Sequence, residues 1–317
     1  MAEKNKILIL GSLAYDHEMK YNGLFKDLIL PDTYNISITT GKKNVYFGGC
    51  AGNIAYNLRL LGQEVTVITV AGKDFGEYRQ WLASCGVDLT GVYQSEKFYT
   101  ASATICTDNE QNQITFFDPG AMYEVDTTQT VKTLDYGSIA WAIISPENPK
   151  RMMKYAYECK ELKIPFIFDP GQVIPMLDNE ELLWGVKNAD IFIVNGHEAK
   201  MLNTRLGLTS DLIAKMSQVY IETHGEKGST IMGKNGVFYI RAVQPSKTID
   251  PTGCGDAFRA GLLAGLREGK SMERCGQAGA LLATYSIENE GTQQHKFTME
   301  EFSTRLENNF GSRWEEQ

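Results

Sequence analysis

The sequence is poor in the features that mark metal-binding, secreted and membrane proteins. Its six cysteines include no CxxC pair and its four histidines are scattered, so their spacing indicates neither a zinc site nor a disulfide framework. No segment approaches the roughly 18 apolar residues of a membrane span, and the apolar run near the N-terminus is too short for a signal peptide. We therefore expect reduced thiols, no membrane partner and a cytoplasmic location.

The chain also lacks an excess of positive charge. Its formal net charge is −8, whereas nucleic acids and anionic membranes bind clustered Lys and Arg. We therefore expect no nucleic-acid partner. The chain has 317 residues, of which 43% are hydrophobic, so it is long enough to bury a large core in one or two domains.

Short apolar runs recur along the chain and predict strands that are covered on both faces. They lie at 6–12, 65–72, 139–145, 164–170, 189–195 and 218–225. Helical patterns lie between most of them, for example at 51–62, 75–86, 149–163 and 255–269. This alternation predicts an α/β fold in which one domain, residues 1–317, holds a mainly parallel sheet with helices on both faces.

Two regions break this alternation, at about 13–47 and 97–118. They are richer in Thr, Tyr, Phe and Ile, with partial alternation and little helical period. We predict that they form a small antiparallel sheet, inserted as a lid over a pocket. An ordinary extension of the main sheet is the alternative.

The stretch "DPTGCGDAFRAG", from Asp250 to Gly261, predicts a loop that leads into a helix beginning near Asp256. Peptide N–H groups at such a helix start, reinforced by the helix dipole, bind anions. The stretch is not a Walker loop, and it is not GxGxxG because position 258 is Phe. Asp256 is then either a first-turn or capping acid, or a general base beside the anion site.

This stretch resembles the C-terminal signature of the ribokinase (PfkB) family of carbohydrate and nucleoside kinases. "FGGCAGNIAYNLRLLG" at 47–62 resembles the N-terminal signature, and "NGHE" at 195–198 and "THGEKG" at 223–228 follow in family order. Segments at 11–32, 116–122 and 169–172 look like those of bacterial adenosine kinases of the mycobacterial type. The resemblance implies a ribokinase-like fold with a β-sheet lid, and transfer of the ATP γ-phosphoryl group to the 5′-hydroxyl of adenosine, which yields AMP.

The resemblance assigns the catalytic base to Asp256 and an anion hole to Gly253, Cys254 and Gly255. We expect the helix dipole to keep Asp256 ionised. Cys254 replaces the small Ala of the family's sugar kinases, and we favour a packed thiol over a redox switch. For Arg259 the alternatives are a contact with the ATP phosphates and a surface salt bridge.

The resemblance also implies a set of residues around the nucleoside. Asp16 would accept hydrogen bonds from the ribose 2′- and 3′-hydroxyls, and Phe117 would stack on the base. The remaining contacts to the sugar and base would come from Ser12, Gly48, Gly49, Asn53 and Gln172. A turn-capping Asp16 and a Phe117 in the ordinary core are the alternatives. Ala103 stands where the mycobacterial-type enzymes have a second stacking Phe, which opens the pocket to other purine nucleosides.

The ATP site is expected at residues that the resemblance places around the phosphates. They are Asn195, Thr223, Gly225, Gly228, Gly253, Gly255 and Arg259. Asn195 and Glu198 would organise Mg²⁺, largely through water, and a monovalent cation is left open. The alternatives are a first-turn acid for Glu198 and a simple hairpin turn for the glycines. An exposed apolar lid face favours a homodimer through the lid.

Other functions remain open at this stage. The nearest are a broad-specificity nucleoside kinase and a sugar kinase of the ribokinase or fructokinase type. Phe117 favours a nucleoside over a sugar, and the missing second aromatic weakens that preference. A non-catalytic nucleoside sensor is disfavoured because Asp256 and the glycine-rich loop are intact.

Overall fold

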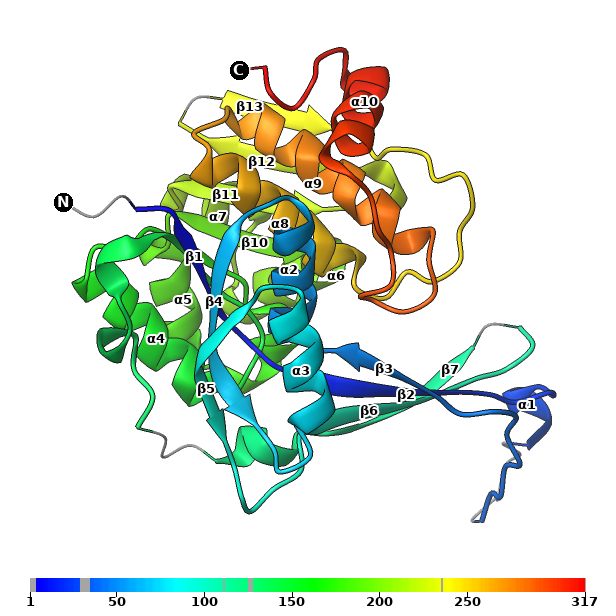
Figure 1. The fold of residues 1–317 in the computed structure, drawn as a ribbon. Coiled ribbons are helices and arrows are strands. Elements are labelled where there is room, and N and C mark those ends of the chain that lie inside the picture. The colour runs from blue at the N-terminus through cyan, green and yellow to red at the C-terminus, as the bar shows by residue number, and fades with distance from the viewer. Residues whose placement is uncertain (1–3, 29–34, 111, 125–127, 235, 317) are drawn as a thin grey trace.

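The computed structural model describes residues 4–28, 35–110, 112–124, 128–234 and 236–316. Its main body contains a nine-stranded sheet in the order β13-β12-β11-β10-β9-β8-β1-β4-β5 (Figure 1). The strands are β1 (Lys6–Leu10), β4 (Glu64–Ala71), β5 (Asp88–Gln94), β8 (Ile139–Ile144), β9 (Phe166–Phe168), β10 (Ile191–Asn195), β11 (Val219–Thr223), β12 (Ser229–Gly233) and β13 (Gly236–Ile240). All neighbours pair in parallel except β11 with β12 and β12 with β13.

Helices cover both faces of this sheet, as the alternating sequence pattern predicted (Figure 1). One face carries α2 (Cys50–Leu60), α3 (Gly76–Ser84), α8 (Cys254–Arg267), α9 (Met272–Ile287) and α10 (Met299–Phe310). The other face carries α4 (Pro149–Glu161), α5 (Asn179–Asn188), α6 (Gly196–Leu206) and α7 (Ser210–Met216). Alternate β1 residues enter the two cores, with Ile7 on one side and Leu8 on the other. The prediction of a mainly parallel α/β sheet with helices on both faces is confirmed.

Three strands of the main sheet were not predicted. β5 contains Asp88, Thr90 and Gly91, which interrupt its apolar pattern. β12 and β13 lie at the other edge, where β13 is largely exposed. The edge strands β5 and β13, and β12 next to β13, bury only part of their surface, so their sequences lack the continuous apolar run that marks a central strand.

A second sheet projects from the main body as the lid (Figure 1). Its order is β3 (Asn44–Gly48), β2 (Ala14–Lys20), β6 (Ala101–Thr107) and β7 (Gln113–Asp118), and the short helix α1 (Phe25–Leu28) lies at its far end. All four strands fall within or one residue beyond the predicted segments. The expectation of a purely antiparallel sheet is wrong, because β2 and β6 pair in parallel. They follow β1 and β5, two strands of one parallel sheet, so both leave the body in the same direction.

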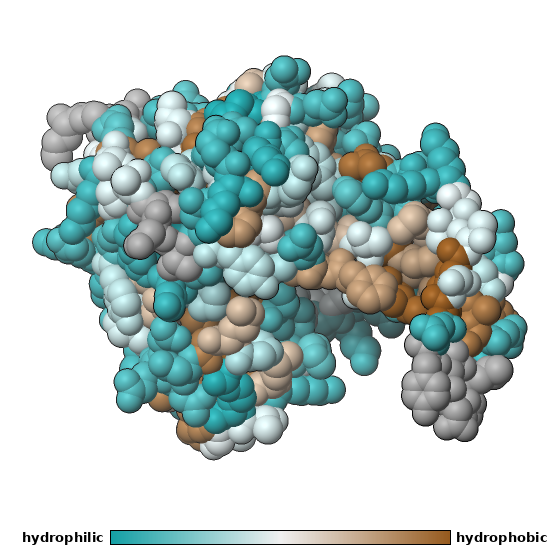
Figure 2. All heavy atoms as spheres, turned by 90° about the horizontal axis from the view of Figure 1, so that it is seen from below, coloured by the Kyte–Doolittle hydropathy of each residue, from teal (hydrophilic) through white to brown (hydrophobic). Residues whose placement is uncertain are grey.

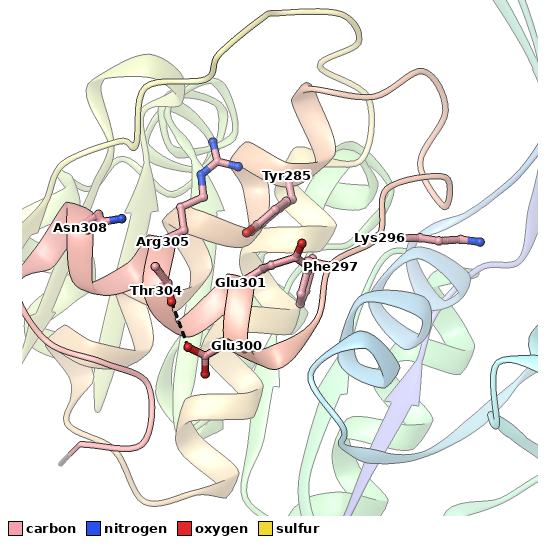
Figure 3. Close-up of a pocket in the computed structure, with 8 residues that line it drawn as sticks. All are labelled: Tyr285, Lys296, Phe297, Glu300, Glu301, Thr304, Arg305 and Asn308. Carbon is pink, nitrogen blue, oxygen red and sulfur yellow. Dashed lines mark hydrogen bonds between the residues drawn. The ribbon is translucent and has the colours of Figure 1, made fainter.

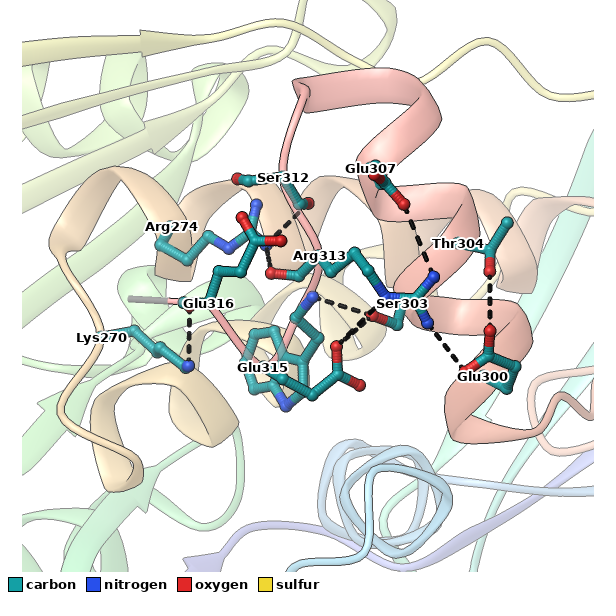
Figure 4. Close-up of polar contacts among 11 residues, drawn as sticks. Lys270, Arg274, Glu300, Ser303, Thr304, Glu307, Ser312, Arg313, Glu315 and Glu316 are labelled. Atoms are coloured by element: carbon teal, nitrogen blue, oxygen red, sulfur yellow. Dashed lines mark hydrogen bonds and ion pairs between the residues drawn. The ribbon is translucent and has the colours of Figure 1, made fainter.

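Polar contacts hold the C-terminal segment against α9 and α10 (Figure 4). Lys270 Nζ donates to the Glu316 carbonyl at 2.9 Å and Ser303 Oγ donates to Glu315 at 2.6 Å. Arg313 pairs with Glu300 at 2.7 Å. Within the described part of the chain, no helix is long and apolar enough to span a membrane.

Candidate active site

The glycine-rich stretch forms the start of α8, as the sequence indicated. The helix begins at Cys254, two residues before Asp256, and Gly253 is its N-cap residue. Gly253 has φ 76°, a left-handed conformation that glycine adopts at little cost. The Cys254 N–H donates to the Pro251 carbonyl at 3.3 Å, so it is already engaged in a turn. The next N–H groups, of Gly255 and Asp256, belong to the first turn, where an α-helix offers no intrahelical acceptor.

Asp256 lies in the first turn of α8 and is partly exposed. Asn53 of α2 donates its Nδ2 hydrogen to Asp256 Oδ2 at 2.8 Å. Burial raises the pKa of Asp256 to about 6, although Asn53 and Arg259 act in the opposite direction. Burial therefore works against the expected effect of the helix dipole, which stays a prediction. At neutral pH it is still mostly ionised and able to accept a proton.

The lid presents one row of side chains toward α8. Tyr46, Asp16, Ala103 and Phe117 are aligned partners on β3, β2, β6 and β7, so their side chains share one face of the lid. Burial, together with the negative charges of Asp256 and Asp250, raises the pKa of Asp16 to about 6. Asp16 therefore lies close enough to Asp256 for the two carboxylates to repel each other.

The root of the lid and the start of α2 gather the other residues expected at the sugar. Ser12 Oγ accepts a hydrogen bond from the Cys50 N–H at 3.2 Å, and the Gly49 carbonyl accepts one from the Asn53 N–H at 3.0 Å. The Gly48 carbonyl accepts a hydrogen bond from the Tyr78 hydroxyl at 2.8 Å. Gln172 is farther along the chain, exposed in the short 3₁₀ helix η4 (Gly171–Met176).

Arg259 forms a buried ion pair, which differs from the contact with ATP phosphates and the surface salt bridge that were the two expected alternatives. Its guanidinium donates to both carboxylate oxygens of Asp169, which follows β9, with Nη2 and Oδ1 2.8 Å apart. Both side chains are buried, so the ion pair is neither a surface salt bridge nor a free cation for the ATP phosphates. The local sequence could not reveal this partner, because it lies 90 positions away.

Three of the residues expected at ATP share one pocket. Asn195, Thr223 and Gly225 line a cavity of about 650 Å³ between the start of α6 and the turn after β11. Lys200 and Lys227 also line it and supply positive charge. The other lining residues are Gly196, His197, Ala199, Asn203, Ser210, Glu222, His224 and Glu226. Gly228 closes the neighbouring turn, where its N–H donates to the Gly225 carbonyl at 3.0 Å.

Asn195 and Glu198, the expected magnesium residues, form a capping box at the start of α6. Asn195 Oδ1 accepts from the N–H groups of His197 and Glu198, and Glu198 Oε2 accepts from the Asn195 N–H at 2.7 Å. The described residues include no group of three or more His, Cys, Asp or Glu side chains placed to hold a metal ion. Mg²⁺ commonly keeps several waters and binds phosphates, so the second Glu198 oxygen fits an outer, water-mediated contact.

A further pocket lies away from these residues, between α9 and α10 (Figure 3). It measures about 390 Å³ and is lined by Tyr285, Lys296, Phe297, Glu300, Glu301, Thr304, Arg305 and Asn308. Arg305 is paired with Glu288 at 2.7 Å, so its charge is already compensated. The pocket contains none of the residues that the sequence singled out.

Sequence reasoning missed Gln293, Tyr78 and Trp81, which lie directly behind Asn53. Gln293 is 1% exposed and forms hydrogen bonds with Trp81, Tyr78 and Asn53. The three lie outside every recognised motif, and Gln293 contacts Asn53 across 240 positions. No local pattern could have marked them.

Comparison with known proteins identifies the family. The model of the pfkB family of carbohydrate kinases matches residues 4–298, and the chain belongs to this family of enzymes, which transfer a phosphoryl group to a hydroxyl acceptor. A nucleoside kinase of Methanocaldococcus jannaschii is 31% identical over 95% of this chain and 97% of that protein. An adenosine kinase of Saccharomyces cerevisiae is 29% identical over 159 residues, 45% of this chain and 47% of that protein.

The structural comparison agrees. The structure of a Burkholderia thailandensis nucleoside kinase in complex with inosine superposes with a TM-score of 0.89 at 37% identity, over 97% of this chain and 99% of that one. The resemblance to the ribokinase family is thus confirmed. The narrower resemblance to mycobacterial-type adenosine kinases stays a prediction.

Proposed function

We propose that the protein is an ATP-dependent purine nucleoside kinase that phosphorylates the 5′-hydroxyl, with adenosine as one acceptor among several. The observation that carries this proposal is the lid row in which Asp16 and Phe117 flank the small Ala103, opposite Asp256. A carboxylate suits a vicinal diol, and an aromatic ring suits a base. The Burkholderia kinase in complex with inosine supports an acceptor range wider than adenosine.

In this proposal each region has one task. Asp16 holds the ribose diol and Phe117 stacks on the base, so that the 5′-hydroxyl points at Asp256. Asp256 accepts the hydroxyl proton as the oxygen attacks the γ-phosphorus and ADP leaves. The N–H groups of Gly255 and Asp256 stabilise the negative charge on the transferring group. Mg²⁺, when bound near Glu198, supplies charge neutralisation to the phosphates.

The donor side of the proposal rests on the cavity beside α6. Its volume of about 650 Å³ is within the range typical of small-molecule sites, and it brings together Asn195, Thr223 and Gly225, with Lys200 and Lys227 available to pair with phosphates beside Glu222 and Glu226. We assign it to ATP. Arg259 does not touch the nucleotide in this account, because it holds Asp169 beneath α8.

The identity of the product tests the proposal. The protein is incubated with γ-labelled ATP and adenosine or inosine, and the labelled product is separated by chromatography. We expect the label in the nucleoside 5′-monophosphate. Label found only in inorganic phosphate with either nucleoside, or transferred to free sugars but to neither nucleoside, would refute the nucleoside assignment.

We further propose that residues 1–317 act as one catalytic domain in a cytoplasmic homodimer. The lid face opposite Asp16 carries Val45 and Phe116, which are 52% and 69% exposed, and Figure 2 shows apolar residues gathered on the projecting lid. All six cysteines are free thiols, which suits a reducing compartment.

Light scattering coupled to gel filtration tests the dimer. We expect twice the chain mass of 35.4 kDa for the wild type and the single chain mass for Phe116→Glu, because a charge on this face opposes its burial. A wild type that elutes as a monomer at every concentration would refute the proposed interface.

A further inference from the structure

A line of hydrogen bonds, buried at its centre, leads from α3 to the Asp256 carboxylate. Trp81 Nε1 donates to Gln293 Oε1 at 2.9 Å. Gln293 Nε2 donates to Asn53 Oδ1 at 3.1 Å and to the Tyr78 hydroxyl at 2.7 Å. Asn53 Nδ2 donates to Asp256 Oδ2 at 2.8 Å. Gln293, Tyr78 and Asn53 are at most 4% exposed, so these groups depend on one another rather than on water.

The direction of this line follows from the chemistry of its first member. An indole N–H can donate a hydrogen bond but cannot accept one. The end of the Gln293 amide that faces Trp81 must therefore be the oxygen. The Gln293 amide nitrogen then faces Asn53 and donates a hydrogen bond to the Asn53 amide oxygen. The Asn53 amide nitrogen is therefore the end that faces Asp256.

Tyr78 fixes the same direction independently. Its hydroxyl hydrogen is used on the Gly48 carbonyl, which can only accept, at 2.8 Å. The Tyr78 oxygen therefore presents an acceptor to Gln293, again requiring the amide nitrogen on that side. Gly52 makes this approach possible, because a Cβ there would lie 1.8 Å from the Tyr78 hydroxyl oxygen.

We propose that Gln293 is a positioning residue that, held by Trp81 and Tyr78, keeps the Asn53 amide oriented so that Asp256 always receives a hydrogen-bond donor. This inference rests on the proposed role of Asp256 as the base and extends it to residues that do not touch a substrate. A reversed Asn53 amide would present its oxygen, to which only a protonated carboxyl group can donate. Fixing the amide therefore disfavours the protonated, inactive form of the base.

The groups that face Asp256 from other elements set the background for this effect. Burial raises the pKa of Asp256, as does the Asp169 carboxylate, whereas Asn53 of α2, Arg259 of α8 and the Cys50 side chain lower it. The other charged or titratable neighbours that respond to Asp256 are Asp16, Cys50, Tyr78 and Cys254. Neither Trp81 nor Gln293 carries a charge. Replacing either with an uncharged residue therefore changes the orientation of the Asn53 amide without changing the net charge near Asp256.

Gln293→Met is the direct test because it removes both polar atoms at similar length. The carboxyl carbon of Asp256 is followed by ¹³C NMR during a pH titration, with its signal assigned from an Asp256→Asn sample. We expect the Asp256 titration to move up by about one pH unit, because a freed Asn53 amide can turn to accept from the protonated carboxyl. The midpoint of the acid limb of kcat/KM should move equally, with the plateau above about pH 8.5 retained within about threefold.

Two further variants separate orientation from simple loss of stability. Trp81→Phe and Tyr78→Phe each leave the other anchor in place, so each alone should move the titration by less than about 0.3 pH units, and together by about as much as Gln293→Met. Tyr56→Phe is the matched control, because it removes a buried hydrogen bond of 2.6 Å to the His295 carbonyl outside this line and should move nothing.

An unmoved Asp256 titration in folded Gln293→Met would overturn the proposal, as would a rate loss of equal size at every pH. If Gln293→Met fails to fold, the double variant decides in the same way. The NMR titration needs no substrate, so it reports on this inference even if the protein phosphorylates no nucleoside.

Discussion

Asp256 combines a raised pKa with a fixed hydrogen-bond donor, which is the state a general base needs near neutral pH. Replacing it with Asn keeps the shape and removes the proton acceptor. We expect Asp256→Asn to lower kcat by about 10²- to 10⁴-fold while KM for the nucleoside changes little. Steady-state kinetics with purified protein measure this. A variant that retained wild-type kcat would show that another group takes the proton.

The same residue sets a pH dependence of stability with a definite sign. The pKa of Asp256 is about 6 in the folded protein and 3.8 in its unperturbed state, so the folded state binds the proton more tightly. Its ionisation therefore costs stability as pH rises from about 4 to about 6, and that cost persists above this range. We expect Asp256→Asn to be more stable than the wild type by about 1–2 kcal/mol at pH 8 and equally stable near pH 4. Urea denaturation at the two pH values checks this.

Activity should show the complementary profile. Asp16 and Asp256 both titrate near pH 6 and repel each other, so they lose their protons as a coupled pair. We expect kcat/KM to fall below about pH 6, with a limiting slope steeper than that of one proton. Asp16→Asn should move the fall in kcat/KM that reports on Asp256 to lower pH, because it removes a neighbouring negative charge. A limb that moved up instead would contradict the proposed proximity.

At the scale of single elements, β7 offers a matched pair of aromatic residues. Phe117 lies on the same face of the lid as Asp16, with Ala103 between them, whereas Phe116 lies on the opposite face of the same strand. We expect Phe117→Ala to raise KM for adenosine about 5- to 150-fold, since aromatic stacking on a base contributes about 1–3 kcal/mol. Phe116→Ala should change it less than about twofold. Equal effects of the two variants would mean that Phe117 acts through the lid rather than on the base.

A buried ion pair joins α8 to the segment that follows β9. Arg259 holds Asp169 with both partners buried, whereas Lys26 and Glu110 form a pair that is 61% and 51% exposed. Breaking a buried pair leaves an uncompensated charge, so Asp169→Asn should destabilise the protein by about 3–5 kcal/mol. Glu110→Gln should cost less than about 1 kcal/mol. Thermal and chemical denaturation compare the two variants, and comparable losses would contradict the buried-pair account.

The sequence predicted elements whose cause is local and missed those whose cause is distant. Continuous apolar runs identified β1, β4, β8, β9, β10 and β11, because central strands need apolar side chains on both faces. The exposed edge strands lack that signal. The motif residues Asp16, Asn53 and Asp256 could be singled out because short patterns surround them, whereas the partners Arg259–Asp169 and Gln293–Asn53 meet only through tertiary structure. The parallel pairing of β2 with β6 likewise follows from chain direction in the main sheet.

For the whole molecule, charge separates the two proposed substrates. The net charge is −8, and lid residues Asp16 and Glu18 both lie near Asp250, with burial raising the pKa of Glu18 to about 7. A neutral nucleoside is indifferent to this field, whereas ATP is repelled unless a cation compensates its phosphates. We expect chelation by EDTA to abolish ADP release and weaken ATP binding about tenfold or more, while nucleoside binding changes less than about twofold. Calorimetric titrations with and without Mg²⁺ measure both affinities, and metal-independent ATP binding would contradict this picture.

The acceptor profile of the wild-type protein tests the central claim most directly. ADP release from Mg-ATP is measured with adenosine, inosine, guanosine, cytidine, ribose and fructose in parallel, each at several concentrations. The account predicts turnover of adenosine and at least one other purine nucleoside, with kcat/KM far above that for either free sugar. Turnover of free sugars alone would contradict it and return Asp16 and Phe117 to roles that do not involve a nucleoside.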